Sequence, residues 1–167
     1  MPKSSGYVSP EYLQMIASVI KPFKDNSYRL MNIKDGDTVF DLGCGPGCDT
    51  KEMAVFVGDT GKVYGVDIDE EMVAIADKEV MKAGLANRVV HLVGSVQKLP
   101  FEDNYFDSCR AERLFQVIPA NIERHLLFTE IRRVLKPGGK LVLIDTDWGT
   151  STVDFPDSEL ERKLMTF

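Results

Sequence analysis

The stretch TVFDLGCGPG, residues 38–47, decides the fold of this 167-residue chain. Its β-branched and aromatic start is typical of a buried strand, and the glycines at 43, 45 and 47 are typical of a tight turn that lets a ligand approach the backbone. The following residues, CDTKEMAVF, predict a helix whose free N–H groups and positive dipole end would face the occupant of the turn. The stretch therefore predicts a ligand-binding strand–loop–helix unit.

A second apolar strand, KVYGVD at 62–67, ends on Asp67, twenty residues after Gly47. This spacing suits a carboxylate that holds a ribose diol at the neighbouring strand tip, but the spacing alone does not name the ligand. A dinucleotide fingerprint requires G-x-G-x-x-G, and the last position of that frame is Cys48 here. The glycines therefore disfavour a nicotinamide dinucleotide.

Four motifs stand in a fixed order along the chain: VFDLGCGPG, VYGVDID, LPFEDNYFD and VLKPGGKLVLID. In this order they resemble the class I S-adenosylmethionine-dependent methyltransferases of the small-molecule, methyltransferase domain 11-like type, over roughly residues 35–148. The resemblance implies an α/β, doubly wound Rossmann-like sheet with parallel strands in the order 3-2-1-4-5, flanked by helices. It also implies S-adenosyl-L-methionine as the cofactor and S-adenosyl-L-homocysteine as the product.

The resemblance assigns roles to the residues that match the family's motifs. Asp41 would orient the methionine amino group, and Asp67 would hold the ribose hydroxyls. The remaining cofactor contacts would come from the backbone of Gly43, Cys44, Gly45 and Gly47, from Ile68 and Met72 beside the adenine, from Ser95 and Val96 at its edge, and from the backbone of Arg110 or Ala111. Ser95 stands where the family usually carries an aspartate, so we expect a weaker contact there.

The acceptor is expected to be a small molecule, and no catalytic residue is assigned. Methyl transfer from a sulfonium is an in-line displacement, so holding the two reacting atoms in line is the main requirement. Candidate acceptor residues, each equally compatible with an ordinary surface position, are Tyr7, Tyr12, Arg113, Gln116, Asp147 and Trp148. His91 lies inside a strand pattern and His125 on a charged helix, so both are interpreted as structural or solvated, and no metal is expected.

Composition excludes several other classes. A net charge of −6 and a pI near 5.0, without a basic run, argue against a nucleic-acid-binding surface. The resemblance implies one further exclusion: no Asn-Pro-Pro-Tyr-type tetrapeptide follows the fourth strand, which disfavours methylation of a base amino group by the family's usual route. Three cysteines without a C-x-x-C pair favour a reducing compartment. No signal-like or membrane-spanning apolar segment is present, so a cytoplasmic location is expected.

The predicted elements alternate after two N-terminal helices. We expect a helical cap segment over 1–34, a cofactor-binding core over 35–148 and an incomplete end of the same domain over 149–167. The helices are predicted at 10–21, 23–33, 47–57, 69–84 and 121–135, and the strands at 38–43, 62–67, 89–94, 105–110 and 140–145. In the resembled family the N-terminal helices lie over the substrate site, but the interpretation favoured for Leu13, Ile16 and Ile20 is that they cover the core. Pro137-Gly138-Gly139 is predicted to separate the last helix from the last strand.

Three functions remain open from the sequence: a methyltransferase acting on a small molecule, a cofactor-binding module without catalysis, and a nicotinamide-dependent oxidoreductase. The second is suggested by Ser95 and by the short segment after the fifth strand. Because the resembled fold continues with two further strands, we expect either that the chain is part of a longer domain or that it self-associates through the exposed edge at Leu141–Ile144.

Overall fold

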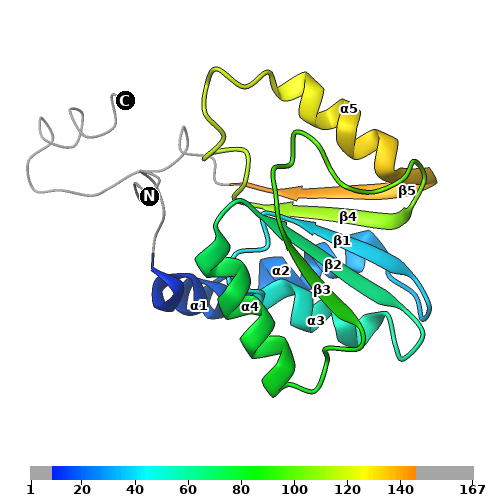
Figure 1. The fold of residues 1–167 in the computed structure, drawn as a ribbon. Coiled ribbons are helices and arrows are strands. Elements are labelled where there is room, and N and C mark those ends of the chain that lie inside the picture. The colour runs from blue at the N-terminus through cyan, green and yellow to red at the C-terminus, as the bar shows by residue number, and fades with distance from the viewer. Residues whose placement is uncertain (1–8, 146–167) are drawn as a thin grey trace, which may run out of the picture.

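The computed structural model describes residues 9–145, in which five parallel strands form one sheet with helices on both faces (Figure 1). The helices are α1 Pro10–Val19, α2 Lys21–Met31, α3 Cys48–Phe56, α4 Glu70–Lys82 and α5 Arg124–Val134. The strands are β1 Thr38–Leu42, β2 Lys62–Asp67, β3 Val89–Val93, β4 Phe106–Glu112 and β5 Leu135–Ile144. The alternation of strands and helices predicted from Thr38 onward is confirmed as far as β3 and again from β4 to β5, whereas β4 follows β3 without an intervening helix.

The strand order is β3-β2-β1-β4-β5, as predicted, and every neighbouring pair is parallel. Parallel pairing aligns the carboxyl ends of the strands at one edge of the sheet, which is where ligands bind in folds of this kind. The register places Asp41 of β1 beside Gly65 of β2 and beside Arg110 of β4. Within residues 9–145, β3 and β5 are the two edge strands, and self-association through β5 stays a prediction.

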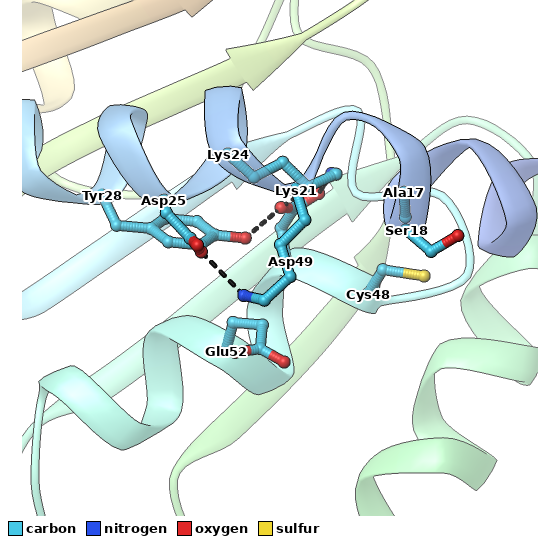
Figure 2. A pocket seen from close by; sticks show the side chains of 9 residues that line it. All are labelled: Ala17, Ser18, Lys21, Lys24, Asp25, Tyr28, Cys48, Asp49 and Glu52. Carbon is cyan, nitrogen blue, oxygen red and sulfur yellow. Dashed lines mark hydrogen bonds and ion pairs between the residues drawn. The ribbon is translucent and has the colours of Figure 1, made fainter.

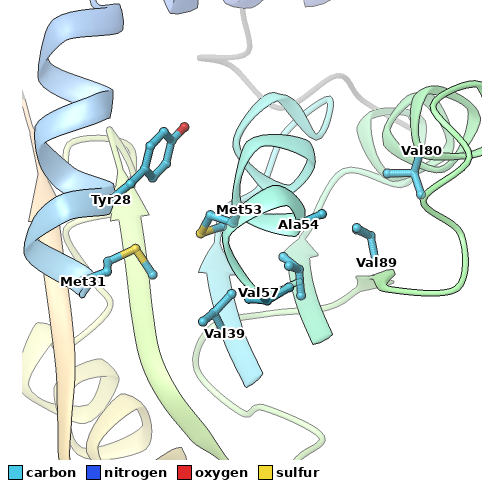
Figure 3. Packing of buried hydrophobic residues seen from close by; sticks show 9 residues of the cluster. Tyr28, Met31, Val39, Met53, Ala54, Val57, Val80 and Val89 are labelled. Atoms are coloured by element: carbon cyan, nitrogen blue, oxygen red, sulfur yellow. The ribbon is translucent and has the colours of Figure 1, made fainter. Parts of the chain in front are cut away.

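Side-chain alternation along the strands divides the core into two layers. Val39, Val63 and Val89 face the layer of α2, α3 and α4, where they pack with Met53 and other buried residues (Figure 3). The side chains on the other face of the sheet pack against Ile131 and Val134 of α5; they include Phe40, Leu42, Val66, Cys109 and Ala111. Asp41, Gly65 and Arg110 share the parity of Val39 and Val63, so they face the α2–α4 layer.

Helix α1 does not cover the core in the way the apolar spacing predicted. Ser9 caps the helix as expected, its hydroxyl accepting the N–H of Tyr12 at 3.3 Å. No residue of α1 is buried, and Leu13, Ile16 and Ile20 are only half-buried. The core-covering interpretation is therefore wrong, because α1 lies at the margin of the fold and only partly over its neighbours.

The Pro137-Gly138-Gly139 segment lies within β5 and does not precede it. The helix α5 ends at Val134, and the strand begins at the next residue, Leu135. The register with β4 shifts between the pairs Phe106–Leu135 and Ser108–Lys140. Between these two pairs β5 contains more residues than β4, and the additional residues form an irregularity within the strand.

Smaller differences concern helix ends and faces. The second helix begins at Lys21 and not at residue 23, with Pro22 in its first turn, where a missing N–H has no cost. The helix α4 buries Met72, Val73, Ala76 and Val80. Within residues 9–145, no helix is both long and apolar enough to cross a membrane.

Candidate functional site

The loop between β1 and α3 folds back onto the end of β2. The N–H groups of Gly43 and Cys44 both donate to the carbonyl of Val66, at 2.8 and 2.9 Å. The Cys44 side chain is buried beneath the loop, and burial raises the pKa of its thiol well above the usual value. Cys44 therefore packs the loop and is not an activated nucleophile.

Two glycines of this loop are needed for different reasons. Gly45 has φ 50° and Gly47 has φ 76°, a region that residues with a side chain rarely adopt. A Cβ at Gly47 would lie 2.8 Å from the Cβ of Ala76 on α4, whereas a Cβ at Gly45 would meet, among the described residues, only Leu13 at 3.8 Å. Packing thus requires Gly47, while the backbone at Gly45 is open to a ligand beneath α1.

Asp67, at the end of β2, holds this loop in place. Its Oδ2 accepts the N–H of Gly45 at 2.8 Å, and its Oδ1 accepts the N–H of Asp69 at 3.0 Å. The residue is only 7% exposed, and burial raises the pKa of its carboxyl. Each carboxylate oxygen has a second lone pair, so the side chain can accept further hydrogen bonds from a ligand.

Asp41, on the neighbouring strand β1, is a buried carboxylate that lacks a hydrogen-bond donor in the described part of the chain. Its closest charged neighbour is Arg110, whose Nη1 lies 3.6 Å from Oδ1, too far for a hydrogen bond. Burial raises the pKa of Asp41 to about 7, against the opposing effect of the Arg110 charge. A carboxylate in this position is costly unless a ligand supplies a donor or a positive charge.

Arg110, on β4, connects Asp41 to a buried ionic network. Its Nε donates to the Ser27 hydroxyl at 3.0 Å, its Nη2 donates to Glu112, and its Nη1 lies 3.2 Å from Asp49 Oδ2. The guanidinium also lies over the Tyr28 ring, 5.3 Å from its centroid. Sequence reasoning assigned only the backbone of Arg110, but its side chain is the completely buried centre of this network.

Lys24 of α2 completes the network from the other side. Its Nζ donates to both oxygens of Asp49, at 2.9 and 2.7 Å, and to Glu112 Oε2 at 2.8 Å. Although burial opposes ionisation of Asp49, the charges of Arg110 and Lys24 hold the pKa of that carboxyl below its usual range. Asp49 is thus an ion-paired anion, in contrast to Asp41.

A small cavity of about 200 Å³ lies between α1–α2 and the start of α3 (Figure 2). Its lining includes Ala17, Tyr28, Cys48 and Asp49. Figure 2 shows the Tyr28 hydroxyl pointing at Asp49, to which it donates a hydrogen bond. The cavity therefore adjoins the ionic network on the side of the two N-terminal helices.

The residues predicted beside the adenine lie at the ends of β2 and β3. Ile68 is 66% exposed directly after β2, and Met72 is buried in the first turns of α4. The Ser95 hydroxyl accepts the N–H of Gln97 at 3.2 Å, so part of its capacity is used by its own turn, and Val96 is half-buried beside it. Their contact with adenine stays a prediction.

The acceptor candidates are distributed over two parts of the fold. Tyr12 is 42% exposed on α1. Arg113 follows β4 with φ 52°, and its N–H donates to the carbonyl of Ile144 at 2.7 Å, while the N–H of Gln116 donates to the Asp145 carboxylate at 3.1 Å. Their role in binding an acceptor stays a prediction, and Tyr7, Asp147 and Trp148 lie outside the described residues.

His91 is a structural residue, as its strand position predicted. Its side chain is enclosed between Thr50 of α3, at 2.9 Å from Nε2, and Asp77 of α4, at 2.8 Å from Nδ1. Burial lowers the pKa of His91, against the effect of Asp77. In residues 9–145, no cluster of His, Cys, Asp and Glu side chains is suited to a metal ion.

Sequence reasoning missed the network residues Lys24, Ser27, Tyr28, Asp49 and Glu112. Two sequence patterns fit part of this set, although neither shows which residues pair with which. Lys24, Ser27 and Tyr28 follow i, i+3, i+4 spacing on α2, and Arg110 and Glu112 alternate on one face of a buried strand. Polar residues on inward faces of buried elements are expected to pair with each other.

Comparison with known proteins agrees with this geometry. A family model described as a methyltransferase domain matches residues 40–143. A demethylmenaquinone methyltransferase of Bacillus pumilus is 34% identical over 126 residues, which are 75% of this chain and 52% of that protein. An uncharacterized 37.1 kDa protein in transposon TN4556 of Streptomyces fradiae is 35% identical over 153 residues, 90% of this chain and 43% of that protein.

The crystal structure of a SAM-dependent methyltransferase from Aquifex aeolicus is similar over 95% of this chain and 86% of that one, with a TM-score of 0.74 and 29% identity. The chain spans about half the length of the curated relatives that it matches.

Proposed function

The chain belongs to the methyltransferase-domain family of class I S-adenosylmethionine-dependent enzymes, and from this premise we propose that it transfers a methyl group from S-adenosyl-L-methionine to a small-molecule acceptor. The matched region contains the glycine-rich loop together with Asp41, Asp67 and Arg110. The comparisons offer no support for a nicotinamide-dependent reaction. Relatives that carry the name demethylmenaquinone methyltransferase support a small organic acceptor.

The observation that carries this proposal is the pair of buried carboxylates on adjacent strands, with the glycine-rich loop beside them. Asp41 lacks a hydrogen-bond donor in the described part of the chain and needs a positive charge. Asp67 already holds the loop and has lone pairs left for a diol. An ammonium group at Asp41 and ribose hydroxyls at Asp67 match the two ends of S-adenosylmethionine.

The bound cofactor supplies an electrophilic methyl group on a sulfonium. The residues of this chain contribute binding and orientation, because an in-line displacement depends on holding the acceptor atom and the methyl carbon on one axis. Asp41 would fix the amino-acid end, Asp67 the ribose, and the backbone of Gly45 the part between them. An in-line displacement has no obligatory general base, and none is assigned.

The adenine would lie between the ends of β2 and β3. The exposed Ile68 side chain and the buried Met72 would cover its faces, while Ser95 and Val96 would meet its edge. Because Ser95 is uncharged and already accepts a hydrogen bond from Gln97, the adenine contact would be weak, and the ribose and amino-acid contacts would carry most of the affinity.

Calorimetric titration tests the proposal with three ligands: S-adenosyl-L-homocysteine, 5′-methylthioadenosine and NAD. We expect S-adenosyl-L-homocysteine to bind and NAD not to bind. We also expect Asp41→Asn to weaken S-adenosyl-L-homocysteine, which carries an ammonium group, while leaving 5′-methylthioadenosine, which lacks it, almost unchanged.

Equal loss of both ligands in Asp41→Asn would contradict the assignment of Asp41 to the amino-acid end. Binding of the cofactor without methyl transfer to any of a panel of acceptors would identify the chain as a cofactor-binding module.

A further inference from the structure

The helix α2 turns a polar face toward the sheet. Its buried residues are Lys24, Ser27, Tyr28 and Met31, and the first three enter the ionic network around Arg110. An inward helix face is normally apolar, and a lysine is almost never buried without a partner. This face therefore serves more than the packing of α2.

Two lysines on the same helix differ in their surroundings. The Lys24 side chain is 8% exposed and is bound by the carboxylates of Asp49 and Glu112. The Lys21 side chain is 60% exposed and pairs with Asp25 one turn further along α2. Lys21 therefore provides a matched control for a charge on this helix.

The cations of the network are shared unevenly among its carboxylates. Lys24 and Arg110 contact Asp49 and Glu112 closely, and Arg113 lies a further 3.5 Å from Glu112 Oε1. Of these cations only Arg110 reaches toward Asp41, at 3.6 Å. Asp41 is therefore the carboxylate with the weakest ion pairing.

We propose that Lys24 is a positioning residue for the cofactor, which acts by neutralising Asp49 and Glu112 so that Asp41 remains ionised and available to the cofactor's ammonium group. This inference rests on the proposed function, in which Asp41 receives that group. It also joins α2 to the cofactor site, since the same lysine ties this helix to α3 and β4.

The charged groups that face Asp41 come from three elements and act in opposite directions. Arg110 of β4 and Lys24 of α2 favour the ionised carboxylate, whereas Asp49 of α3 and Glu112 of β4 disfavour it. Loss of Lys24 should therefore make Asp41 harder to ionise, and loss of Glu112 should make it easier. The two changes predict opposite shifts in the pH dependence of cofactor binding.

The experiment measures binding of S-adenosyl-L-homocysteine and of 5′-methylthioadenosine by calorimetry between about pH 6 and pH 8.5. For the unmodified protein, affinity for S-adenosyl-L-homocysteine should rise with pH, with a midpoint near the Asp41 pKa of about 7. In Lys24→Met this midpoint should rise by about one pH unit, the size expected for one neighbouring charge, which corresponds to roughly fivefold weaker binding near pH 7.

The control ligand and variants separate positioning from folding. Affinity for 5′-methylthioadenosine should not change in Lys24→Met, because this ligand has no ammonium group, and Lys21→Met should match the unmodified protein with both ligands. Lys24→Arg should restore the midpoint. If Lys24→Met does not fold, Glu112→Gln provides the test, since the midpoint of its pH dependence of S-adenosyl-L-homocysteine binding should move to lower pH.

Three results would overturn the inference. The first is an unchanged midpoint in folded Lys24→Met, the second is an equal loss of both ligands, and the third is an unchanged or upward midpoint in Glu112→Gln. Failure of the proposed function would look different, since the unmodified protein would then bind neither ligand, or Asp41→Asn would bind S-adenosyl-L-homocysteine normally.

Discussion

Replacing Asp67 by alanine should weaken S-adenosyl-L-homocysteine binding by about 1.5–3 kcal/mol, roughly tenfold to more than a hundredfold. The physical reason is the loss of hydrogen bonds between a carboxylate and the ribose hydroxyls at a site that is only 7% exposed. The same substitution removes the bonds from the N–H groups of Gly45 and Asp69. Because each is a hydrogen bond to a charged group and water replaces part of it, we also expect a stability loss of about 2 kcal/mol.

The two effects of Asp67→Ala can be measured separately. Urea unfolding without ligand gives the stability change, and calorimetry under folded conditions gives the affinity change. A 2′,3′-dideoxy analogue of S-adenosyl-L-homocysteine completes a cycle, because it removes the ligand's half of the interaction. It should bind the variant and the unmodified protein almost equally. An unchanged affinity for S-adenosyl-L-homocysteine in a folded variant would refute the ribose assignment, and a large loss with the dideoxy analogue would show that Asp67 acts only on the loop.

Substitutions at two loop glycines, at His91 and at Arg110 test other parts of the structure. Gly45→Ala should fold, with a loss of stability of about 1 kcal/mol, and should bind the cofactor more weakly. Gly47→Ala should lose more stability, because its Cβ would clash with Ala76. Thermal melts and calorimetry that show equal losses of stability and of cofactor affinity in the two variants would contradict this. Because burial lowers the pKa of His91, the neutral form should stabilise the protein above about pH 6.5, and that stability should be lost as the pH falls below this value. In urea titrations His91→Gln should lose this dependence on pH, and a retained slope would contradict it. Arg110→Met leaves its carboxylate partners uncompensated and should cost about 3–5 kcal/mol in urea unfolding, so that a loss below about 1 kcal/mol would exclude a central role for this network.

The strands themselves and the position of the glycine-rich loop followed from local signals, whereas the order of the strands came from the resemblance to the methyltransferase family. Apolar runs of strand length alternate with helical periods from Thr38 onward, and such alternation has few topological solutions. Asp67 could be placed because it ends a predicted strand at the carboxyl edge of the sheet, and Asp41 because it lies near the same end of the neighbouring predicted strand. Their surroundings in the structure are consistent with the roles that the motifs suggested.

The ionic network could not be derived in the same way. Periodicity treats a lysine such as Lys24 as an outward residue, and its partners Asp49 and Glu112 are distant in sequence. Only the packing of α2 against α3 and β4 brings these charges together. The prediction for Pro137–Gly139 was wrong for a related reason. Proline and glycine predict a turn, but the pairing of β5 with β4, which is distant in sequence, keeps this segment within the strand.

The central claim is that Asp41 and Asp67 hold the two ends of the cofactor at the glycine-rich loop. A crystal structure of the protein with S-adenosyl-L-homocysteine tests it most directly. We expect the ligand's ammonium group at hydrogen-bonding distance from the Asp41 carboxylate, and both ribose hydroxyls on the Asp67 carboxylate, with the ligand passing close to Gly45. A ligand bound elsewhere, or one that leaves the Asp41 carboxylate without a positive partner, would contradict the account.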